Sequence, residues 1–338
     1  MSVIIIAEAG VNHNGDIDKA LKLVKVAADA GADFVKFQTF KTELNISKAA
    51  EKANYQKKGA GIDESQFEMV KRMELTYNQF IRISKECLKH NISFLSTAFD
   101  NPSIDFIDSL NPEFFKIPSG EVTNKLYLRY IAGKKRPVVL STGMSNLQEV
   151  KEAVAELEKG GLLRKQVTVL HCNTEYPTPM KDVNLKAMLQ IGDELGVEVG
   201  YSDHTLGIEV PIAAVALGAC IIEKHFTLDR NLKGPDHSAS LEPSELKSMI
   251  RAIRNVEMAI SGSGMKETTK SEKINIDIAR KSLFTSKPIR RDTRLTQGDL
   301  IALRPGDGIS PMRIDELIGK KVKSDLPGYH KLSMQDLL

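Results

Sequence analysis

The stretch that decides the fold is VIIIAE, residues 3–8, in which five apolar residues end abruptly in a carboxylate. The same unit, a short apolar run that stops at polar residues, occurs eight times along the chain. The eight units lie at residues 3–8, 34–38, 92–97, 114–116, 138–143, 167–173, 197–204 and 220–225. Short β-branched runs of nearly continuous apolarity are typical of parallel strands that are buried on both faces.

Helical patterns separate these runs. Residues 18–30, 146–159 and 210–217 each place small or apolar side chains on one side of a helix. Eight strand–helix units over about 260 residues predict a (β/α)8 TIM barrel, whose usual size is similar. A doubly wound sheet is the alternative, but no G-x-G-x-x-G motif follows the first strand.

The chain is expected to have three parts: a barrel at 1–262, a linker at 263–279 and a small second domain at 280–338. Serine and glycine alternate just before a long polar stretch, which is typical of a linker. The second domain is predicted to hold one helix, at 313–318. Residues 41–66 form a connection too long for a plain βα loop, and we expect it to cover the barrel mouth.

Composition excludes several classes of protein. Among 338 residues, 47 Lys and Arg balance 44 Asp and Glu, giving a net charge of +3 without charged blocks. Nucleic acid and anionic membranes require clustered positive charge, so neither is expected as a partner. No apolar run approaches the ~20 residues of a membrane span, and no basic leader opens the chain. Cys87, Cys172 and Cys220 are unpaired in pattern, so we expect reduced thiols and a cytoplasmic location.

Polar residues gather where the predicted strands end. In a TIM barrel the catalytic groups lie at the C-terminal ends of the strands. These ends carry Glu8, Lys36, Gln38, Thr97, Lys116, Ser119, Ser141, His171, Ser202, His204, Glu223 and His225. Charged side chains rarely lie against a barrel core unless they are paired or functional, so this set predicts the active site.

Two histidines indicate a metal. Glu223 and His225 share one face of the eighth strand, and His204 ends the neighbouring seventh strand. Two imidazoles that meet beside a carboxylate suggest a divalent ion, held loosely because open positions remain. The alternative is that both are core histidines with satisfied hydrogen bonds.

An ammonium, hydroxyls and loop amides predict an anion site. Lys116, Ser119, Ser141 and the Thr142-Gly143 turn supply these groups. The alternative is that the STG segment is only a strand-to-helix turn. The segment GPDH, residues 234–237, is a tight turn that presents a carboxylate and an imidazole at the same mouth.

Motifs along the whole chain resemble the sialic acid synthase family. They are IAEAGVNHNG (6–15), KFQTF (36–40), KIPSGE (116–121), LSTGM (140–144), HCNTEYPTP (171–179), YSDHT (201–205), EKHFT (223–227) and GPDH (234–237). The tail, with RPGDGI at 304–309, resembles the antifreeze-like SAF domain that follows the barrel in this family. The resemblance therefore implies an α/β fold made of a (β/α)8 barrel and a small SAF domain.

The resemblance also implies a reaction. N-acetylneuraminate synthases condense phosphoenolpyruvate with an N-acetylhexosamine, N-acetylmannosamine, to give a nine-carbon 2-keto acid and phosphate. Legionaminate and pseudaminate synthases are the alternative, with the same chemistry on a diacetamido-dideoxy hexose. The barrel motifs do not separate these substrates.

Residue roles follow from the resemblance. His204 and His225 would hold a divalent ion, Mn²⁺ first and Mg²⁺ or Co²⁺ as alternatives. Glu8 or Glu223 would carry protons, with Lys36 beside the charged groups of the substrate. The remaining substrate-binding positions are Gln38, Thr97, Lys116, Ser119, Ser141, Tyr176, Ser202, Asp236 and Arg304.

Within that set, Lys116, Ser141 and Ser119 would bind phosphoenolpyruvate, and Gln38, Tyr176 and Asp236 would orient the sugar. Arg304 would reach the acetamido group of the sugar across a domain-swapped homodimer. A further sugar contact is expected at Asn54 or Gln56.

Two other classes of function compete with this interpretation. A Schiff-base aldolase could use Lys36, Lys116 or Lys224 as its nucleophile with pyruvate. A non-enzymatic protein could use the tail as a recognition module on an inert barrel, although the ionisable residues at the strand ends argue against it. Lys36, Lys116, Lys224 and Arg304 are expected to form a local cluster that suits an anionic three-carbon substrate.

Overall fold

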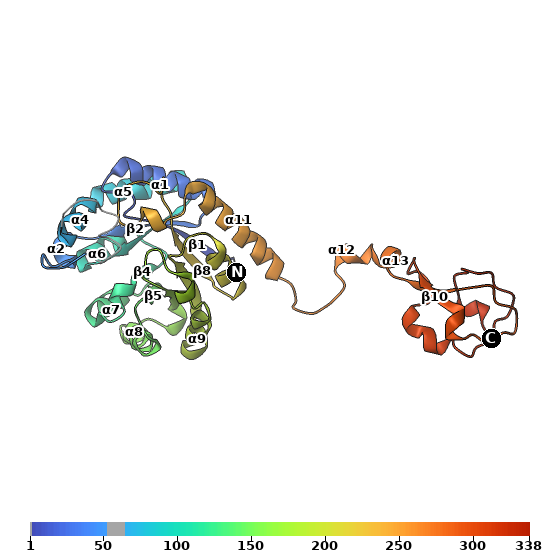
Figure 1. The fold of residues 1–338 in the computed structure, drawn as a ribbon. Helices are drawn as coiled ribbons and strands as arrows, with labels where there is room; N and C mark the ends of the chain where they lie inside the picture. Colours follow the sequence, from blue (N-terminus) through green and yellow to red (C-terminus); the bar gives the residue numbers. More distant parts are fainter. Residues whose placement is uncertain (1, 53–64) are drawn as a thin grey trace. The chain divides into compact units, whose positions relative to one another are not determined.

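A computed structural model describes residues 2–52 and 65–338 (Figure 1). Asn54 and Gln56, the predicted sugar contacts, lie outside the described residues. The chain forms two compact units, Met1–Gly262 and Ser263–Leu338. Within the described residues, no helix is both long and apolar enough to cross a membrane.

The first unit is a closed barrel of eight parallel strands in sequence order, which confirms the predicted TIM barrel. The strands are β1 (Ile4–Gly10), β2 (Phe34–Thr39), β3 (Ser93–Ala98), β4 (Phe115–Ile117), β5 (Val138–Ser141), β6 (Val167–Cys172), β7 (Glu198–Asp203) and β8 (Ile221–His225). Barrel closure between β1 and β8 places Glu8 opposite His225, so the first and last motifs of the barrel meet.

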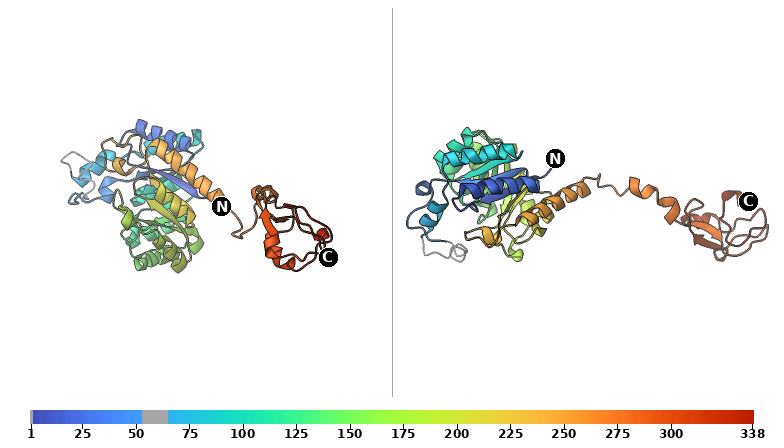
Figure 2. Two further views of the ribbon diagram at one scale, coloured as in Figure 1. Left: turned by 45° about the vertical axis from the view of Figure 1, so that its right-hand side comes forward. Right: turned by 90° about the horizontal axis from the view of Figure 1, so that it is seen from above.

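Helices surround the strands (Figure 1 and Figure 2). They are α1 (Ile17–Ala30), α5 (Tyr77–Lys89), α6 (Asn101–Ser109), α7 (Lys125–Ala132), α8 (Leu147–Lys159), α9 (Lys186–Leu195), α10 (Glu209–Ala216) and α11 (Pro243–Ile260). The described residues of the connection after β2 include α2 (Thr42–Asn45) and α4 (Gln66–Met73).

Helix α1 illustrates how the sequence sets these bounds. The Asp16 carboxylate accepts hydrogen bonds from the backbone N–H groups of Asp18 and Lys19, an N-cap worth about 1 kcal/mol. Gly31 ends the helix with φ of 88°, in the left-handed region that favours glycine. The buried face consists of small and branched residues, so the helix lies close to the barrel.

Alternation along the strands divides the barrel interior into layers. An apolar layer comprises Ile6, Phe34, Leu95, Phe114, Val139, Leu170 and Ile221. Because strand side chains alternate, the residues two positions further along face the same interior. Those residues are Glu8, Lys36, Thr97, Lys116, Ser141, Cys172 and Glu223. The apolar layer therefore lies directly beneath a layer of charged and polar side chains.

The second unit is small and has its own core. Strands β9 (Ser282–Thr285) and β10 (Leu300–Leu303) pair antiparallel. Its buried residues include Leu283, Leu317, Val322 and Leu332. The helix predicted at 313–318 is instead a 3₁₀ segment at Pro311–Glu316, interrupted by non-helical backbone at Arg313.

The predicted linker contains two short helices, α12 (Lys270–Lys273) and α13 (Ile276–Ala279). The backbone N–H of Gly306 donates to the carbonyl of Asp277 at 2.7 Å, so α13 packs within the second unit.

Candidate active site

A pocket of about 430 Å³ opens at the C-terminal ends of the strands. Its size is within the range that holds a small ligand. The charged layer forms its floor, and the next step of two residues along the strands supplies Gln38, Phe99, Pro118, Thr174, His204 and His225. Period-two geometry alone therefore brings most of the predicted residues into one cavity. Ser119, Tyr176, Ser202 and Asp236 also line it.

Two lysines and two glutamates form a buried charge network in the floor. The ammonium of Lys36 lies 3.0 Å from Glu8 Oε1 and 3.6 Å from Glu223 Oε2, and it donates to Thr97 Oγ1 at 2.9 Å. The ammonium of Lys116 donates to Ser141 Oγ at 2.7 Å and lies 3.6 Å from Glu223 Oε1. Glu223 therefore lies between both lysines, whereas Glu8 contacts only one of them among the described residues.

Because Glu223 contacts two lysines and Glu8 contacts one, the pKa values of the two glutamates differ. Burial raises the pKa of Glu8 to about 7, although the Lys36 ammonium opposes the shift. Burial also acts to raise the pKa of Glu223, but Lys116 and Lys36 together outweigh it and lower the pKa. Two carboxyl groups with such different environments can take different roles, a proton carrier at Glu8 and a permanent anion at Glu223.

Unpartnered atoms show where a ligand fits. Glu8 Oε2 and Glu223 Oε2 are buried without a hydrogen-bond partner in the described part of the chain. Buried polar atoms are nearly always hydrogen-bonded, so each such atom in a pocket indicates a group that binds there.

The two histidines lie side by side at the pocket wall. Their ring centroids are 5.3 Å apart, and Tyr176 packs over both, 4.0 Å from His204 and 5.6 Å from His225. The Nδ1 of His204 bonds to the carbonyl of Asn173, which fixes the ring. Asp236 Oδ2 lies 3.9 Å from His225 Nδ1.

These residues fit a divalent ion with open coordination positions. His225 Nδ1 is buried and has no hydrogen-bond partner among the described residues. Burial holds the pKa of His225 well below its usual range, so its imidazole is neutral, as a metal ligand must be. In the part of the chain that the structure describes, no group of three or more His, Cys, Asp or Glu side chains could hold a metal. A metal held by two histidines would keep coordination positions for substrate and water.

The predicted anion site includes a glycine, Gly143, that packs closely against its neighbours. The hydroxyl of Ser119 accepts a hydrogen bond from the N–H of Gly143 at 2.9 Å. A Cβ at position 143 would come within 2.5 Å of Thr174 Cγ2, so only glycine allows this close approach. Burial lowers the pKa of Lys116, the nearest ammonium in the floor.

One expectation about the cations changes. Lys224 does not join the pocket cluster: its side chain is fully buried on the other face of β8, where its ammonium meets Asp203 Oδ2 at 2.5 Å. The reason is alternation, because Glu223 and His225 point inward and Lys224 between them must point outward. Arg304 belongs to the second unit, where it is exposed and its Nε donates to the carbonyl of Ala279.

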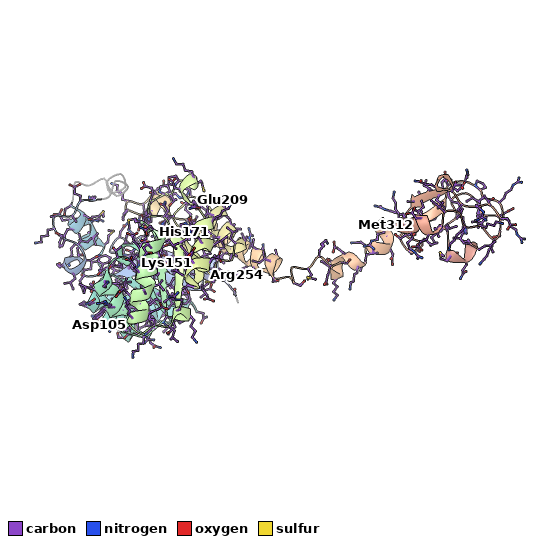
Figure 3. All side chains as sticks on the ribbon, turned by 90° about the horizontal axis from the view of Figure 1, so that it is seen from below. Asp105, Lys151, His171, Glu209, Arg254 and Met312 are labelled. Atoms are coloured by element: carbon purple, nitrogen blue, oxygen red, sulfur yellow. The ribbon has the colours of Figure 1, made fainter. Side chains whose placement is uncertain are left out.

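His171, labelled in Figure 3, also lies outside the pocket lining, and its Nε2 bonds to the carbonyl of Val183 at 2.9 Å. Cys172, for which the sequence predicts only a reduced thiol, lines the pocket. Its position two residues after Leu170 is the signal that could have found it.

An apolar wall completes the pocket. It consists of Val11, Phe40, Met69, Val70, Met73 and Phe99, which pack in one cluster. Helix α4 supplies three of these side chains, Met69, Val70 and Met73. The pocket thus joins a charged floor, which suits a small anion, to an apolar side, which suits alkyl groups.

Known proteins share this architecture and this set of motifs. Residues 23–266 match the NeuB family, and residues 280–327 match the SAF domain. A TIM barrel with this site, followed by a SAF domain, defines a sugar-acid synthase of the transferase type that uses phosphoenolpyruvate. The chain belongs to the NeuB family.

Individual relatives narrow the comparison. The N,N'-diacetyllegionaminic acid synthase of Campylobacter jejuni is 53% identical over 94% of this chain and 95% of its own length. The enzyme of the same name from Legionella pneumophila is 46% identical over 96% of this chain and 92% of its own length. The structure of the N-acetylneuraminic acid synthetase of Leptospira borgpetersenii is 34% identical, with a TM-score of 0.71 over 82% of this chain and 90% of that one.

These relatives bear on the predicted substrate. The expected condensation of phosphoenolpyruvate with a sugar is supported, but identity is higher to the legionaminic acid synthases than to the N-acetylneuraminic acid synthetase. Of these relatives, those with the higher identity therefore carry the name of the alternative hypothesis, legionaminate synthase.

Proposed function

We propose that this protein is a metal-dependent legionaminate-type synthase. It condenses phosphoenolpyruvate with a 2,4-diacetamido-dideoxy hexose and releases a nine-carbon 2-keto sugar acid and phosphate. The observation that carries the choice of sugar is the apolar wall opposite the charged floor. The 53% identity to a diacetyllegionaminic acid synthase supports it.

The floor binds the anionic substrate in this proposal. Lys116 and Ser141, joined at 2.7 Å, supply an ammonium and a hydroxyl for the phosphate and carboxylate. The N–H of Gly143 donates to Ser119 Oγ, so the Ser119 hydroxyl can donate to the same anion. Lys36 and Thr97 hold the other end. Ser202 donates to Glu223 Oε1 at 3.1 Å and keeps that carboxylate in place.

His204 and His225 would hold the ion, Mn²⁺ first and Mg²⁺ or Co²⁺ as alternatives. When bound, such an ion supplies a Lewis acid for the open-chain aldehyde of the sugar. Tyr176, which packs over both rings, and Gln38, which donates to Glu8 Oε1 at 3.3 Å, orient the sugar beside them.

The glutamates manage charge and protons. C3 of phosphoenolpyruvate bonds to the aldehyde carbon, and positive charge develops at C2. Glu223, an anion between two lysines, stabilises that charge. Water then adds to C2, and Glu8 takes its first proton because a pKa of about 7 suits exchange near neutrality. That proton passes to the alkoxide oxygen left where the aldehyde C=O π bond broke. The new C2 hydroxyl loses its remaining proton to the phosphate, which leaves with the former bridging oxygen as the C2 ketone forms.

The apolar wall discriminates between sugars. N-acetylmannosamine carries hydroxyls at C4 and C6, and a hydroxyl buried against Met69, Met73 and Phe40 would lose its hydrogen bonds to water. Such a loss costs about 1–3 kcal/mol. A deoxy carbon or an acetamido methyl gains contact with the same side chains.

We also propose a cytoplasmic homodimer in which Arg304 of one copy reaches the sugar bound in the other. The SAF domain at residues 280–327 and the exposed position of Arg304 support this arrangement. A guanidinium is a suitable partner for the carbonyl oxygen of an acetamido group.

The test is an assay of the purified protein with phosphoenolpyruvate, Mn²⁺ and each sugar separately. Keto acid and phosphate should form in equal amounts, with the higher kcat/KM for the 2,4-diacetamido sugar. Loss of activity with EDTA and its return with Mn²⁺ are expected. The absence of any product from the diacetamido sugar would refute the proposal.

One observation favours a second candidate, a Schiff-base aldolase: burial lowers the pKa of Lys116, as activation of an amine nucleophile requires. Borohydride should trap pyruvate on Lys116 if that candidate is right. Under our proposal borohydride traps nothing, and activity depends on the metal.

A further inference from the structure

The NHNG segment, residues 12–15, bonds to the loop that follows β8. The amide of Asn12, which is 1% exposed, donates to the carbonyl of Phe226 at 2.8 Å and to Ser240 Oγ at 3.0 Å. The Ser240 hydroxyl donates in turn to the backbone carbonyl of Asp236 at 2.7 Å. One asparagine of the β1–α1 loop therefore reaches the backbone of Asp236 through a single buried hydroxyl.

Asn14 forms a second branch. Its amide nitrogen donates to the carbonyl of Lys233 at 2.8 Å and lies 3.1 Å from Nε2 of the fully buried His237. An amide nitrogen can only donate, so His237 Nε2 accepts and its Nδ1 carries the proton. That proton points to Thr227 Oγ1, 2.7 Å away, and the Thr227 hydroxyl donates to the carbonyl of Asp229. The branch is a directed chain of hydrogen bonds across the loop.

The two loops also touch sterically. A Cβ at Gly234 would lie 2.6 Å from His237 Cδ2 and 2.7 Å from Asn14 Oδ1. The glycine lets the backbone of the β8 loop lie against both side chains, so the loop has little freedom to shift.

Both branches flank Asp236, whose side chain lines the pocket with Oδ2 at 3.9 Å from His225 Nδ1. We propose that Asn12, Asn14 and His237 are positioning residues that hold Asp236 at the sugar end of the pocket and thereby set the affinity for the sugar. This role rests on the proposed function. It explains why the NHNG and GPDH segments, which lie far apart in the sequence, are built against each other.

The first test compares Asn14→Ala with Asn91→Ala. Both asparagines have a φ of 53°, so the two variants carry the same backbone strain, but Asn91 lies at the other end of the barrel, beside the start of β3. Asn14→Ala should raise the KM for the sugar about tenfold, which corresponds to about 1.4 kcal/mol. The KM for phosphoenolpyruvate should stay unchanged, and Asn91→Ala should change neither. A similar rise in both KM values would overturn the proposal.

A double-mutant cycle tests whether Asn14 acts through Asp236. In an Asp236→Ala background, Asn14→Ala should have little further effect on the KM for the sugar. An additive effect would mean that Asn14 supports the barrel in general and would overturn the positioning role. Ser240→Ala, which removes the link from Asn12 to Asp236, gives the same comparison if Asn14→Ala folds poorly.

Hydrogen exchange separates this inference from the proposed function. Amides of residues 229–240 should exchange at least severalfold faster in Asn14→Ala than in Asn91→Ala, whatever sugar the enzyme uses. If the wild-type protein makes no keto acid but this loop loosens, the proposed function fails and the positioning contacts stand. Unchanged exchange in an active enzyme would overturn the positioning role alone.

Discussion

At the scale of single residues, the site depends on how burial divides similar groups. Glu8 and Glu223 occupy one buried layer, yet one has a raised pKa and the other a lowered pKa, because the lysines contact them unequally. Burial also lowers the pKa of His225, so that its imidazole is neutral and can bind a metal ion. Amino-acid composition cannot predict such opposite pKa shifts, whereas the contacts of each side chain explain them.

His225→Ala should abolish turnover by removing one of two metal ligands. Calorimetric titration of the metal-free protein with Mn²⁺ should show binding weakened at least about tenfold, as expected when a ligand is lost. The control is His90→Ala, since the His90 imidazole lies at the end of α5, outside the pocket lining, where its Nε2 is 3.4 Å from Glu86 Oε1. Near-normal rates at saturating Mn²⁺ would refute the assignment.

His13 makes the stability of the barrel depend on pH. Burial lowers its pKa from 6.5 to about 4 in the folded protein. Between these values the unfolded chain binds a proton that the folded chain does not, so the free energy of unfolding falls as the pH falls. The loss from this residue between pH 7 and pH 5 is about 2 kcal/mol.

His13→Gln, which does not titrate, should flatten this dependence by about that amount. Urea unfolding at pH 7 and at pH 5 measures it, with wild-type protein as the reference. His237, whose pKa burial also lowers to about 4, titrates in both proteins and cancels in the comparison. Equal pH dependence in the two proteins would contradict the buried, neutral state of His13.

At the scale of elements, a buried ion pair joins β7 to β8 behind the two histidines. The ammonium of Lys224 contacts Asp203 Oδ2 and the carbonyl of Thr205, and Asp203 accepts two hydrogen bonds from Thr205. His204 lies between Asp203 and Thr205 in sequence, so this pair fixes the end of β7.

Lys224→Met should destabilise the barrel by about 3–5 kcal/mol, because it leaves the Asp203 carboxylate buried without a positive charge beside it. The matched control is Lys25→Met, whose ammonium also lies 2.5 Å from a carboxylate, that of Asp29, but on the exposed surface of α1. That variant should lose less than about 1 kcal/mol. Similar losses for both variants in urea unfolding would contradict the account.

The sequence predicts the strands and their ends well, because alternation and abrupt polarity changes are local signals. Glu8, Lys36, Lys116 and Glu223 could be assigned to one layer for that reason. The apolar wall could not be predicted from the sequence, because Met69 and Met73 of α4 follow a long connection that shows no periodic pattern. The hydrogen bonds of Asn12 and Asn14 to the loop after β8 could not be predicted either, because they join segments more than 200 residues apart.

At the scale of the whole molecule, the chain consists of two units with separate cores, and each unit carries different predicted site residues. The barrel holds the charged floor, the two histidines and the apolar wall. The SAF unit carries Arg304. Each has its own buried core, so removal of the Arg304 side chain should alter catalysis without unfolding the barrel.

Arg304→Ala should raise the KM for the sugar much more than the KM for phosphoenolpyruvate, by about tenfold or more if a charged hydrogen bond to the acetamido group is lost. Arg291→Ala, which removes another exposed arginine of the same unit, is the control. Initial rates with each substrate varied in turn measure both constants. Equal effects on the two constants would argue against an acetamido contact.

The central claim is that the pocket joins phosphoenolpyruvate to a diacetamido sugar in preference to N-acetylmannosamine. The most direct measurement is a competition, in which both sugars are present at equal concentration with limiting phosphoenolpyruvate and Mn²⁺. Mass spectrometry of the products then gives the ratio of the two kcat/KM values. We predict at least about a tenfold excess of the diacetamido keto acid, the selectivity expected for burying an unpartnered hydroxyl. An excess of N-acetylneuraminate would contradict the account.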